Sequence, residues 1–267
     1  MMNLRTTEPP NHRTVLDEFR LDGRVALVTG ASPGLGAAMA TALAEAGADV
    51  VLTVRTGPDL EREAEAIRRL GRRALAVPGD VTARADVERI VAEGLDGLGR
   101  IDVLVNNAGV GSDTAFLDLA DADWDRVLDT NLRAAYLCTH VAGRHMVERR
   151  QGKIINVASV AGLVGRSHMA PYAASKGALL QLTRSVAVEW ARHNVQVNAL
   201  CPGYFRTAMN RHFLDGEAGQ RYIRQAVPLG RAGRPEELGP VVVFLASSAS
   251  DFVTGSHVVI DGGRLAH

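Results

Sequence analysis

The chain has 267 residues, of which 46% are hydrophobic, so it can bury the core of one large α/β domain or two small ones. Its 30 basic and 30 acidic residues balance to a formal charge of zero, which gives no electrostatic case for a nucleic-acid or acidic-membrane partner. No apolar run approaches membrane-spanning length, and the polar residues 1–17 lack the apolar core of a signal peptide. We therefore expect a flexible arm over 1–17, one domain over 18–267, and a cytoplasmic protein whose Cys138 and Cys201 stay reduced.

Apolar runs alternate with amphipathic segments along the chain, which is the pattern of a parallel doubly wound sheet. The strands are predicted over Val25–Val28, Asp49–Val54, Ala74–Pro78, Val103–Asn106, Lys153–Ala158, Gln196–Cys201 and His257–Ile260. Helices are predicted between them, most clearly over Asp59–Leu70, Ala85–Leu98, Asp121–Arg149, Tyr172–Arg192 and Pro235–Ala246. The mixed polar and aromatic segment from Tyr204 to Pro228 interrupts this alternation, and long connections of this kind are often functional lids.

A glycine-rich turn over residues 29–36 (Thr-Gly-Ala-Ser-Pro-Gly-Leu-Gly) follows the first predicted strand. After it, Leu35, Met39 and Leu43 fall at i, i+4 and i+8, which predicts an amphipathic helix. Turns of this kind expose backbone amides at the positive end of a helix, where a pyrophosphate binds. The glycine spacing differs from the common Gly-x-Gly-x-x-Gly pattern, so a tight turn without a ligand is the alternative at this point.

Tyr172 and Lys176 stand four residues apart in a predicted helix, so their side chains would share one face. A phenol titrates near pH ~10 in water, and a fixed positive charge beside it lowers its pKa toward the working range of a proton donor. For this pair alone, the alternative is an ordinary tyrosine and lysine on a helix surface. Ser159, at the end of a predicted strand, lies where parallel sheets bind ligands.

The ordered set of motifs from Leu21 to Gly263 resembles the classical short-chain dehydrogenase/reductase family. The matching features are the turn over 29–36, Asp80, Asn106-Asn107-Ala108-Gly109, Asn131, Ser159, Tyr172, Lys176, Pro202-Gly203 with Thr207, and Asp261-Gly262-Gly263. The resemblance implies an α/β single-domain Rossmann fold, with a doubly wound parallel sheet of about seven strands flanked by helices. It also implies hydride transfer between a nicotinamide cofactor and a carbonyl carbon, coupled to proton transfer at the carbonyl oxygen.

Four catalytic roles follow from this resemblance. Tyr172 would exchange the proton with the substrate oxygen, and Lys176 would lower the pKa of Tyr172 and bind the nicotinamide ribose. Ser159 would orient the substrate oxygen as a fixed hydrogen-bond donor. Asn131 would hold a water molecule in the proton relay from the lysine to solvent.

The resemblance also implies a set of cofactor contacts. These are Thr29, Gly30, Ser32, Gly34, Leu35, Gly36, Arg55, Thr56, Asp80, Val81, Asn107, Ala108, Gly109, Tyr172, Lys176, Pro202, Gly203 and Thr207. At the end of the second strand, where an acidic residue would hold the ribose hydroxyls of NAD, this chain has Val54 followed by Arg55. A guanidinium suits a 2′-phosphate, so NADP(H) is expected over NAD(H), which stays possible. The alternatives are a solvated charge for Arg55 and a helix cap for Asp80.

The substrate pocket is expected from residues 108–116, 162–169 and 204–228. Its candidate polar groups are Ser112, His168, Arg206 and Asn210, and its candidate apolar wall is Phe205, Met209 and Phe213. The chain is similar to bacterial sugar-acid dehydrogenases of the gluconate and deoxygluconate groups, which favours a small polar ketone or secondary alcohol. A 3-oxoacyl carrier-protein reductase is the alternative enzyme. A regulator that senses nicotinamide nucleotides is the non-enzyme alternative, and the intact set of four catalytic residues argues against it.

Other site types find little support in the sequence. No His-Glu-x-x-His occurs and His140 and His145 are five residues apart, so no metal site is expected. No Gly-x-Ser-x-Gly surrounds Ser159, which argues against a hydrolase. The apolar run Val241–Leu245 and the last strand resemble surfaces that relatives bury between subunits, which implies a homotetramer or homodimer. The alternative is that this run packs on its own sheet.

Overall fold

Seven parallel strands form one sheet at the centre of the computed structural model, which describes residues 14–57, 59–207 and 210–266. The strands are β1 (Val25–Thr29), β2 (Asp49–Thr53), β3 (Ala74–Ala76), β4 (Val103–Asn106), β5 (Gly152–Val157), β6 (Val195–Pro202) and β7 (His257–Ile260). Their order across the sheet is β3-β2-β1-β4-β5-β6-β7. The strand order reverses between β1 and β4, which is the topological switch point of a doubly wound fold. The predicted fold class is confirmed.

The central strands are apolar because both faces of the sheet are covered. All five residues of β1 and all eight of β6 are buried. The strand boundaries differ from the prediction mainly at β3, which ends at Ala76 rather than at Pro78. Proline has no N–H to donate to the ladder, although the N–H groups of Val77 and Gly79 still donate to the chain at and after β2.

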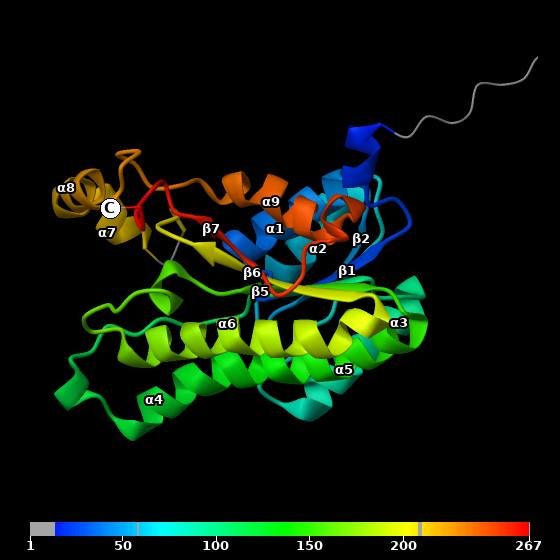
Figure 1. The fold of residues 1–267 in the computed structure, drawn as a ribbon, viewed down its shortest axis with the longest axis horizontal. Coiled ribbons are helices and arrows are strands. Elements are labelled where there is room, and N and C mark those ends of the chain that lie inside the picture. The colour runs from blue at the N-terminus through cyan, green and yellow to red at the C-terminus, as the bar shows by residue number, and fades with distance from the viewer. Residues whose placement is uncertain (1–13, 58, 208–209, 267) are drawn as a thin grey trace, which may run out of the picture.

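Helices form a layer on each face of this sheet (Figure 1). On one face lie α1 (Leu35–Glu45), α2 (Asp59–Arg69) and α9 (Gly239–Ala246), and on the other lie α3 (Arg84–Leu98), α5 (Ala134–Arg149) and α6 (Ala170–Trp190). Alternation along the strands sorts their side chains between the two layers: Ala26 and Val28 pack with the first set, whereas Val25 and Leu27 pack with the second. The sheet is therefore buried on both sides.

The predicted helix over Asp121–Arg149 is interrupted in the structure. It consists of α4 (Asp121–Leu128), a π-helical segment (Asp129–Arg133) and α5. The predicted helix over Pro235–Ala246 likewise begins as a 3₁₀ helix (Pro235–Leu238) before α9, and α6 is followed by a 3₁₀ turn (Ala191–His193). Further 3₁₀ turns are Val15–Phe19, Phe116–Asp118, Val160–Gly162 and Ser248–Ser250. A π segment inside a helix often marks a functional position.

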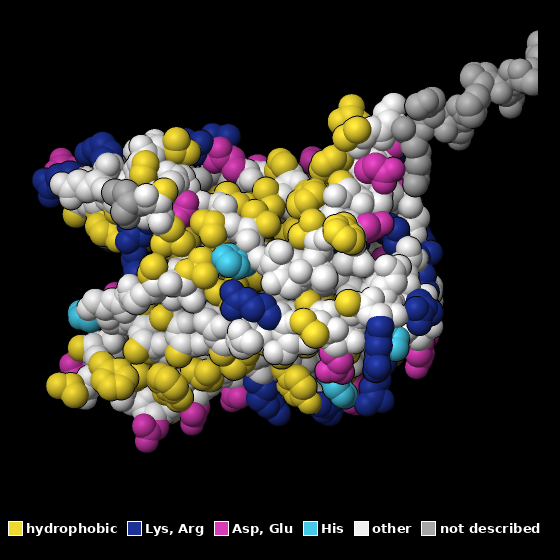
Figure 2. Space-filling view, viewed as in Figure 1, with side chains coloured by type: hydrophobic (Ala, Val, Ile, Leu, Met, Phe, Trp, Pro, Cys, Tyr) yellow, Lys and Arg dark blue, Asp and Glu magenta, His cyan; other side chains and the backbone are white. Residues whose placement is uncertain are grey.

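The segment after β6 contains two helices that the sequence pattern did not indicate. They are α7 (Arg211–Asp215) and α8 (Glu217–Ala226). Leu214, Ile223 and Val227 form a small apolar cluster of their own, apart from the two large core clusters. Figure 2 shows the molecule notched on this side, below the part that carries α7 and α8.

Most of the predicted N-terminal arm lies outside the described residues. Its last residues belong to the 3₁₀ turn Val15–Phe19, and Ser248 Oγ donates a hydrogen bond to the carbonyl of Glu18 at 3.0 Å. Cys138 and Cys201 are buried free thiols. Within the described residues, no helix is both long enough and apolar enough to cross a bilayer.

A buried carboxylate fixes the amino-terminal edge of the sheet. Asp102 is fully buried just before β4, and its carboxylate accepts a hydrogen bond from the backbone N–H of Val25 at 2.9 Å. The guanidinium of Arg100 donates to both carboxylate oxygens, at 2.5 and 2.7 Å, and Arg149 donates to one at 3.3 Å. A buried charge is tolerated only when it is paired and hydrogen-bonded in this way.

We predict that Asp102→Asn lowers the free energy of unfolding by about 2–4 kcal/mol, because it leaves the two arginines and the strand ends without their shared anion. Urea denaturation measures this effect. Asp96→Asn is the matched control, since Asp96 is exposed on α3. Equal unfolding midpoints for the two variants would contradict a stabilising role for the buried carboxylate.

Candidate active site

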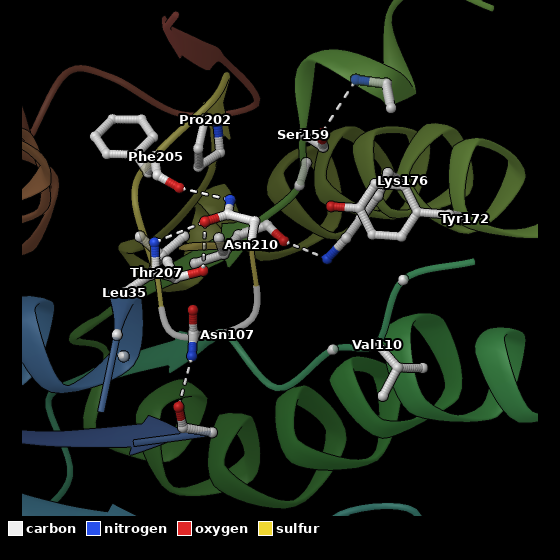
Figure 3. A pocket seen from close by; sticks show the side chains of 18 of the residues that line it. Leu35, Asn107, Val110, Ser159, Tyr172, Lys176, Pro202, Phe205, Thr207 and Asn210 are labelled. Carbon is white, nitrogen blue, oxygen red and sulfur yellow. Dashed lines mark hydrogen bonds between the residues drawn. The ribbon is translucent and has the colours of Figure 1, made fainter. Parts of the chain in front are cut away.

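A cavity of about 410 Å³ opens at the carboxyl ends of β1, β4, β5 and β6 (Figure 3). Its described lining comes from segments that are far apart in the sequence: the glycine-rich turn, the loop after β4, the end of β5, α6 and the chain after β6. The lining residues are Gly30, Ser32–Gly36, Asn107–Gly111, Val157–Ala161, Arg166, Met169, Tyr172, Lys176, Pro202–Phe205, Thr207 and Asn210. This is the crevice in which open α/β sheets bind their ligands.

Two glycines in the turn allow the backbone to approach its neighbours closely. Gly30 has φ +63°, and a Cβ there would lie 2.8 Å from the Cα of Ala108. A Cβ on Gly36 would lie 2.1 Å from the carbonyl oxygen of Gly30. Any larger residue would push the turn away from the sheet. The turn leads directly into the amino terminus of α1. The free amides and the helix dipole at this terminus favour the binding of an anion.

Hydrogen bonds tie this turn to the end of β4. The hydroxyl of Thr29 accepts from the backbone N–H groups of Asn107 and Ala108, at 3.0 and 3.1 Å. In return, the side-chain amide of Asn107 donates to the carbonyls of Thr29 and Gly30, at 3.0 and 2.9 Å. Thr29 is buried and does not line the cavity. Its side chain supports the turn from beneath.

Ser159, Tyr172 and Lys176 lie together in the cavity wall (Figure 3). Ser159 follows β5, and its hydroxyl accepts from the N–H of Ala161 at 3.1 Å, which fixes the start of the next turn. The ammonium of Lys176 lies 5.6 Å from the ring centroid of Tyr172. It also donates to the carbonyl of Val157 at 2.7 Å, so the lysine bridges α6 and β5.

Burial shifts the pKa values of both α6 groups toward their neutral forms. It raises the pKa of Tyr172, and the hydrogen bond with Ser159 opposes that rise. It lowers the pKa of Lys176 to about 8, because the ammonium is enclosed by protein. The expected lowering of the Tyr172 pKa is therefore not found. The physical reason is that desolvation of the phenol outweighs its hydrogen bond with Ser159.

Asn131 lies behind the cavity wall rather than in it. It is buried in the π-helical segment, where its side-chain amide exchanges hydrogen bonds with the backbone of Val110 at 2.8 and 3.0 Å. A Cβ placed on Gly109 would lie 3.2 Å from the Asn131 amide oxygen and 3.5 Å from the Lys176 ammonium. The asparagine and the lysine thus approach the same point of the loop after β4.

The loop after β6 closes the opposite side of the cavity, with Pro202, Gly203 and Thr207 in its lining. Asn210 holds this loop: its amide oxygen accepts from the N–H of Thr207 at 2.9 Å, and its amide nitrogen donates to the carbonyl of Phe205 at 2.7 Å. Asn210 therefore lines the cavity and also supports the loop, and its direct contact with substrate stays a prediction.

Besides Thr29, four residues of the predicted cofactor set lie outside the cavity lining, after β2 and β3. Arg55 and Thr56 are exposed after β2. Asp80 accepts hydrogen bonds from the N–H and hydroxyl of Thr82, at 2.9 and 2.7 Å, so its side chain forms a local turn before α3. Val81 beside it is buried. These residues follow the strands on the same edge of the sheet as the cavity.

The expected substrate groups are only partly brought together. Phe205 lines the cavity, whereas Ser112 and His168 do not, and Arg206 lines a second cavity while pairing with Asp215 at 2.7 Å. Met209 and the side chain of Phe213 lie outside the described part of the chain. Arg166, Met169 and Tyr204 line the cavity without having been singled out from the sequence. The available signal for Arg166 was that it is the only arginine in the predicted pocket segment 162–169.

Comparison with known proteins agrees with this geometry. The family described as Enoyl-(Acyl carrier protein) reductase matches residues 30–264. The 5-keto-D-gluconate 5-reductase of Escherichia coli K12 is 41% identical over 249 residues, which are 93% of this chain and 98% of that protein.

Solved structures agree as well. A short-chain type dehydrogenase/reductase from Mycobacterium marinum is 40% identical with a TM-score of 0.90, over 95% of this chain and 100% of the other. A gluconate 5-dehydrogenase from Burkholderia cenocepacia J2315, in complex with NADP and tartrate, is 40% identical with a TM-score of 0.89, over the same shares. The chain belongs to the short-chain dehydrogenase/reductase family, and it is an NAD(P)-dependent oxidoreductase that interconverts an alcohol and a ketone.

Proposed function

We propose that this enzyme reduces a keto sugar acid of the 5-ketogluconate type with NADPH and oxidises the corresponding alcohol in the reverse direction. The observation that carries the proposal is the cavity in which Ser159, Tyr172 and Lys176 face the glycine-rich turn. The names of relatives support the substrate class, since they include a 5-keto-D-gluconate 5-reductase and a gluconate 5-dehydrogenase. These names do not favour the 3-oxoacyl carrier-protein alternative.

The residues present fit a nicotinamide dinucleotide. A Cβ on Gly30 or Gly36 would collide with neighbouring backbone, so the glycines permit a turn whose amides face an incoming pyrophosphate. Ser32, Gly34 and Leu35 would complete this phosphate site. Asp80 and Val81 would flank the adenine, and the loop over Asn107–Gly109 would support the nucleotide. When bound, the cofactor supplies or accepts the hydride.

The catalytic residues would handle the proton and orient the substrate. Ser159 donates a hydrogen bond that places the substrate oxygen, and Tyr172 transfers its proton to that oxygen in the reductive direction. Lys176 would provide the positive charge that favours the phenolate, and it would bind the nicotinamide ribose. Asn131 holds the loop behind Lys176, on the path by which the proton is replaced from solvent. Pro202, Gly203 and Thr207 would meet the nicotinamide carboxamide.

Two further properties stay predictions. Free buried thiols at Cys138 and Cys201 support a reducing, cytoplasmic location. Exposed large apolar side chains, among them Trp124, Tyr136 and Val188 on the helices of one face, support assembly into a homotetramer.

The first test is turnover. The purified protein should oxidise NADPH in the presence of 5-ketogluconate, which is measured as the loss of NADPH absorbance. The Tyr172→Phe variant should have a kcat at least ~10³-fold lower, with its affinity for NADPH nearly unchanged. Tyr136→Phe is the control, because this tyrosine is exposed on α5 outside the cavity. Undiminished turnover by Tyr172→Phe would refute the assignment of the proton donor. Activity confined to acyl thioesters would refute the substrate class.

The second test concerns the nucleotide. Arg55→Asp should raise the KM for NADPH by about 10–100-fold and should improve the use of NADH, because a carboxylate repels the 2′-phosphate and accepts from the ribose hydroxyls. Arg69→Asp is the control, since Arg69 is exposed at the end of α2. An unchanged ratio of kcat/KM for the two nucleotides would show that Arg55 is a solvated charge.

The third test uses the lowered pKa of Lys176. Because this pKa falls from 10.5 to about 8 on folding, the folded protein binds fewer protons between those pH values, and stability increases as pH rises through them. Relative to Lys176→Met, the ligand-free wild type should gain about 3 kcal/mol of unfolding free energy between pH 7.5 and 10.5. Denaturation at a series of pH values measures it. A difference that is flat with pH would mean that burial leaves the lysine unperturbed.

A further inference from the structure

The described lining of the active-site cavity contains two cationic side chains and no carboxylate. These cations are Lys176 and Arg166. Lys176 is buried, donates to the carbonyl of Val157, and is the partner of Tyr172. It therefore belongs to the proton-transfer group. Arg166 is half-buried, lies in the loop before α6, and has no part in the mechanism described above.

The charge of Arg166 is held by neutral groups. One guanidinium nitrogen, Nη2, donates to the hydroxyls of both Tyr204 and Tyr222. Among the described residues, no carboxylate lies within ion-pair distance of this guanidinium, in contrast to Arg206, which pairs with Asp215 at 2.7 Å. A partly desolvated cation without a protein anion attracts an anionic ligand more strongly than a cation that is already paired.

The two phenols form a support that fixes the orientation of Arg166. Their hydroxyl oxygens are 2.8 Å apart and their rings meet edge-on. On these rings lies a second arginine: the Arg264 guanidinium carbon is 5.4 Å from the Tyr204 centroid and 6.0 Å from the Tyr222 centroid. Because both hydrogen bonds of Arg166 to these phenols come from Nη2, the N–H groups of Nε and Nη1 are left to donate to an anion.

We propose that Arg166 binds the carboxylate of the substrate and makes this enzyme select acids over neutral ketones. The inference rests on the proposed sugar-acid function and extends it by naming the group that recognises the acid. Arg166 and Tyr204 line the same cavity as Ser159 and Tyr172, so one end of the substrate is held at the guanidinium while its ketone meets the proton donor. Tyr204 and Tyr222 act as positioning residues for Arg166.

The test compares a keto acid with its uncharged counterpart. For Arg166→Met, kcat/KM for 5-ketogluconate should fall at least ~100-fold, mainly through KM, whereas kcat/KM for the carboxamide of the same keto acid should change less than ~3-fold. Arg166→Lys keeps the charge but loses the planar guanidinium that the two phenols orient, so it should recover the loss only in part. Arg221→Met is the matched control and should leave both substrates unaffected, because Arg221 is exposed on α8 outside the cavity. Equal losses for acid and carboxamide in Arg166→Met would overturn the proposal.

Binding of D-gluconate to the protein with NADPH separates this inference from the proposed function, because this complex cannot turn over. Calorimetry should give a Kd that rises at least ~30-fold in Arg166→Met and less in Tyr222→Phe. Arg166-dependent gluconate binding without turnover of any keto sugar acid would refute the proposed reaction but support the carboxylate site. Absence of gluconate binding to the wild type, or binding that is the same in Arg166→Met, would overturn the inference.

Discussion

The hydrogen bonds between the end of β1 and the end of β4 are the interaction on which the rest of the site depends. These strands are neighbours in the sheet, but the chain runs outward through β2 and β3 before it returns to β4. Four hydrogen bonds that involve Thr29 and Asn107 hold these two ends together, although the strands are not consecutive along the chain. Because the glycine-rich turn is fixed in this way, the phosphate-binding amides and the catalytic wall face each other across one crevice.

The catalytic wall itself is built at a cost to stability. The ammonium of Lys176 is almost fully buried, and its lowered pKa shows that the folded protein disfavours its charged form. The apolar core that fills both faces of the sheet offsets this cost. Functional sites commonly carry such locally unfavourable groups, and the surrounding structure keeps them in place.

Much of this arrangement could be predicted from the sequence. Buried parallel strands appear in the sequence as apolar runs, and positions where two backbone segments come close together require glycine. The strand β4 was predicted at its observed bounds for this reason. The π-helical break at Asn131 was not predicted, since one extra residue in a turn leaves no clear trace in apolar periodicity. Arg166 was missed because its phenol partners lie 38 and 56 residues further along the chain. A pocket arginine and a surface arginine look alike until folding brings such partners together.

The anchored carboxylate of Asp102 and the catalytic crevice occupy opposite edges of the same sheet. The length of β4 and its flanking residues places them about 15 Å apart, at roughly 3.3 Å per residue. Substitutions at such a separation contribute nearly independently to folding energetics. Thermal stability can therefore be engineered in this enzyme through residues at the amino-terminal edge of the sheet. Substrate specificity can be changed independently through residues at the carboxyl-terminal edge.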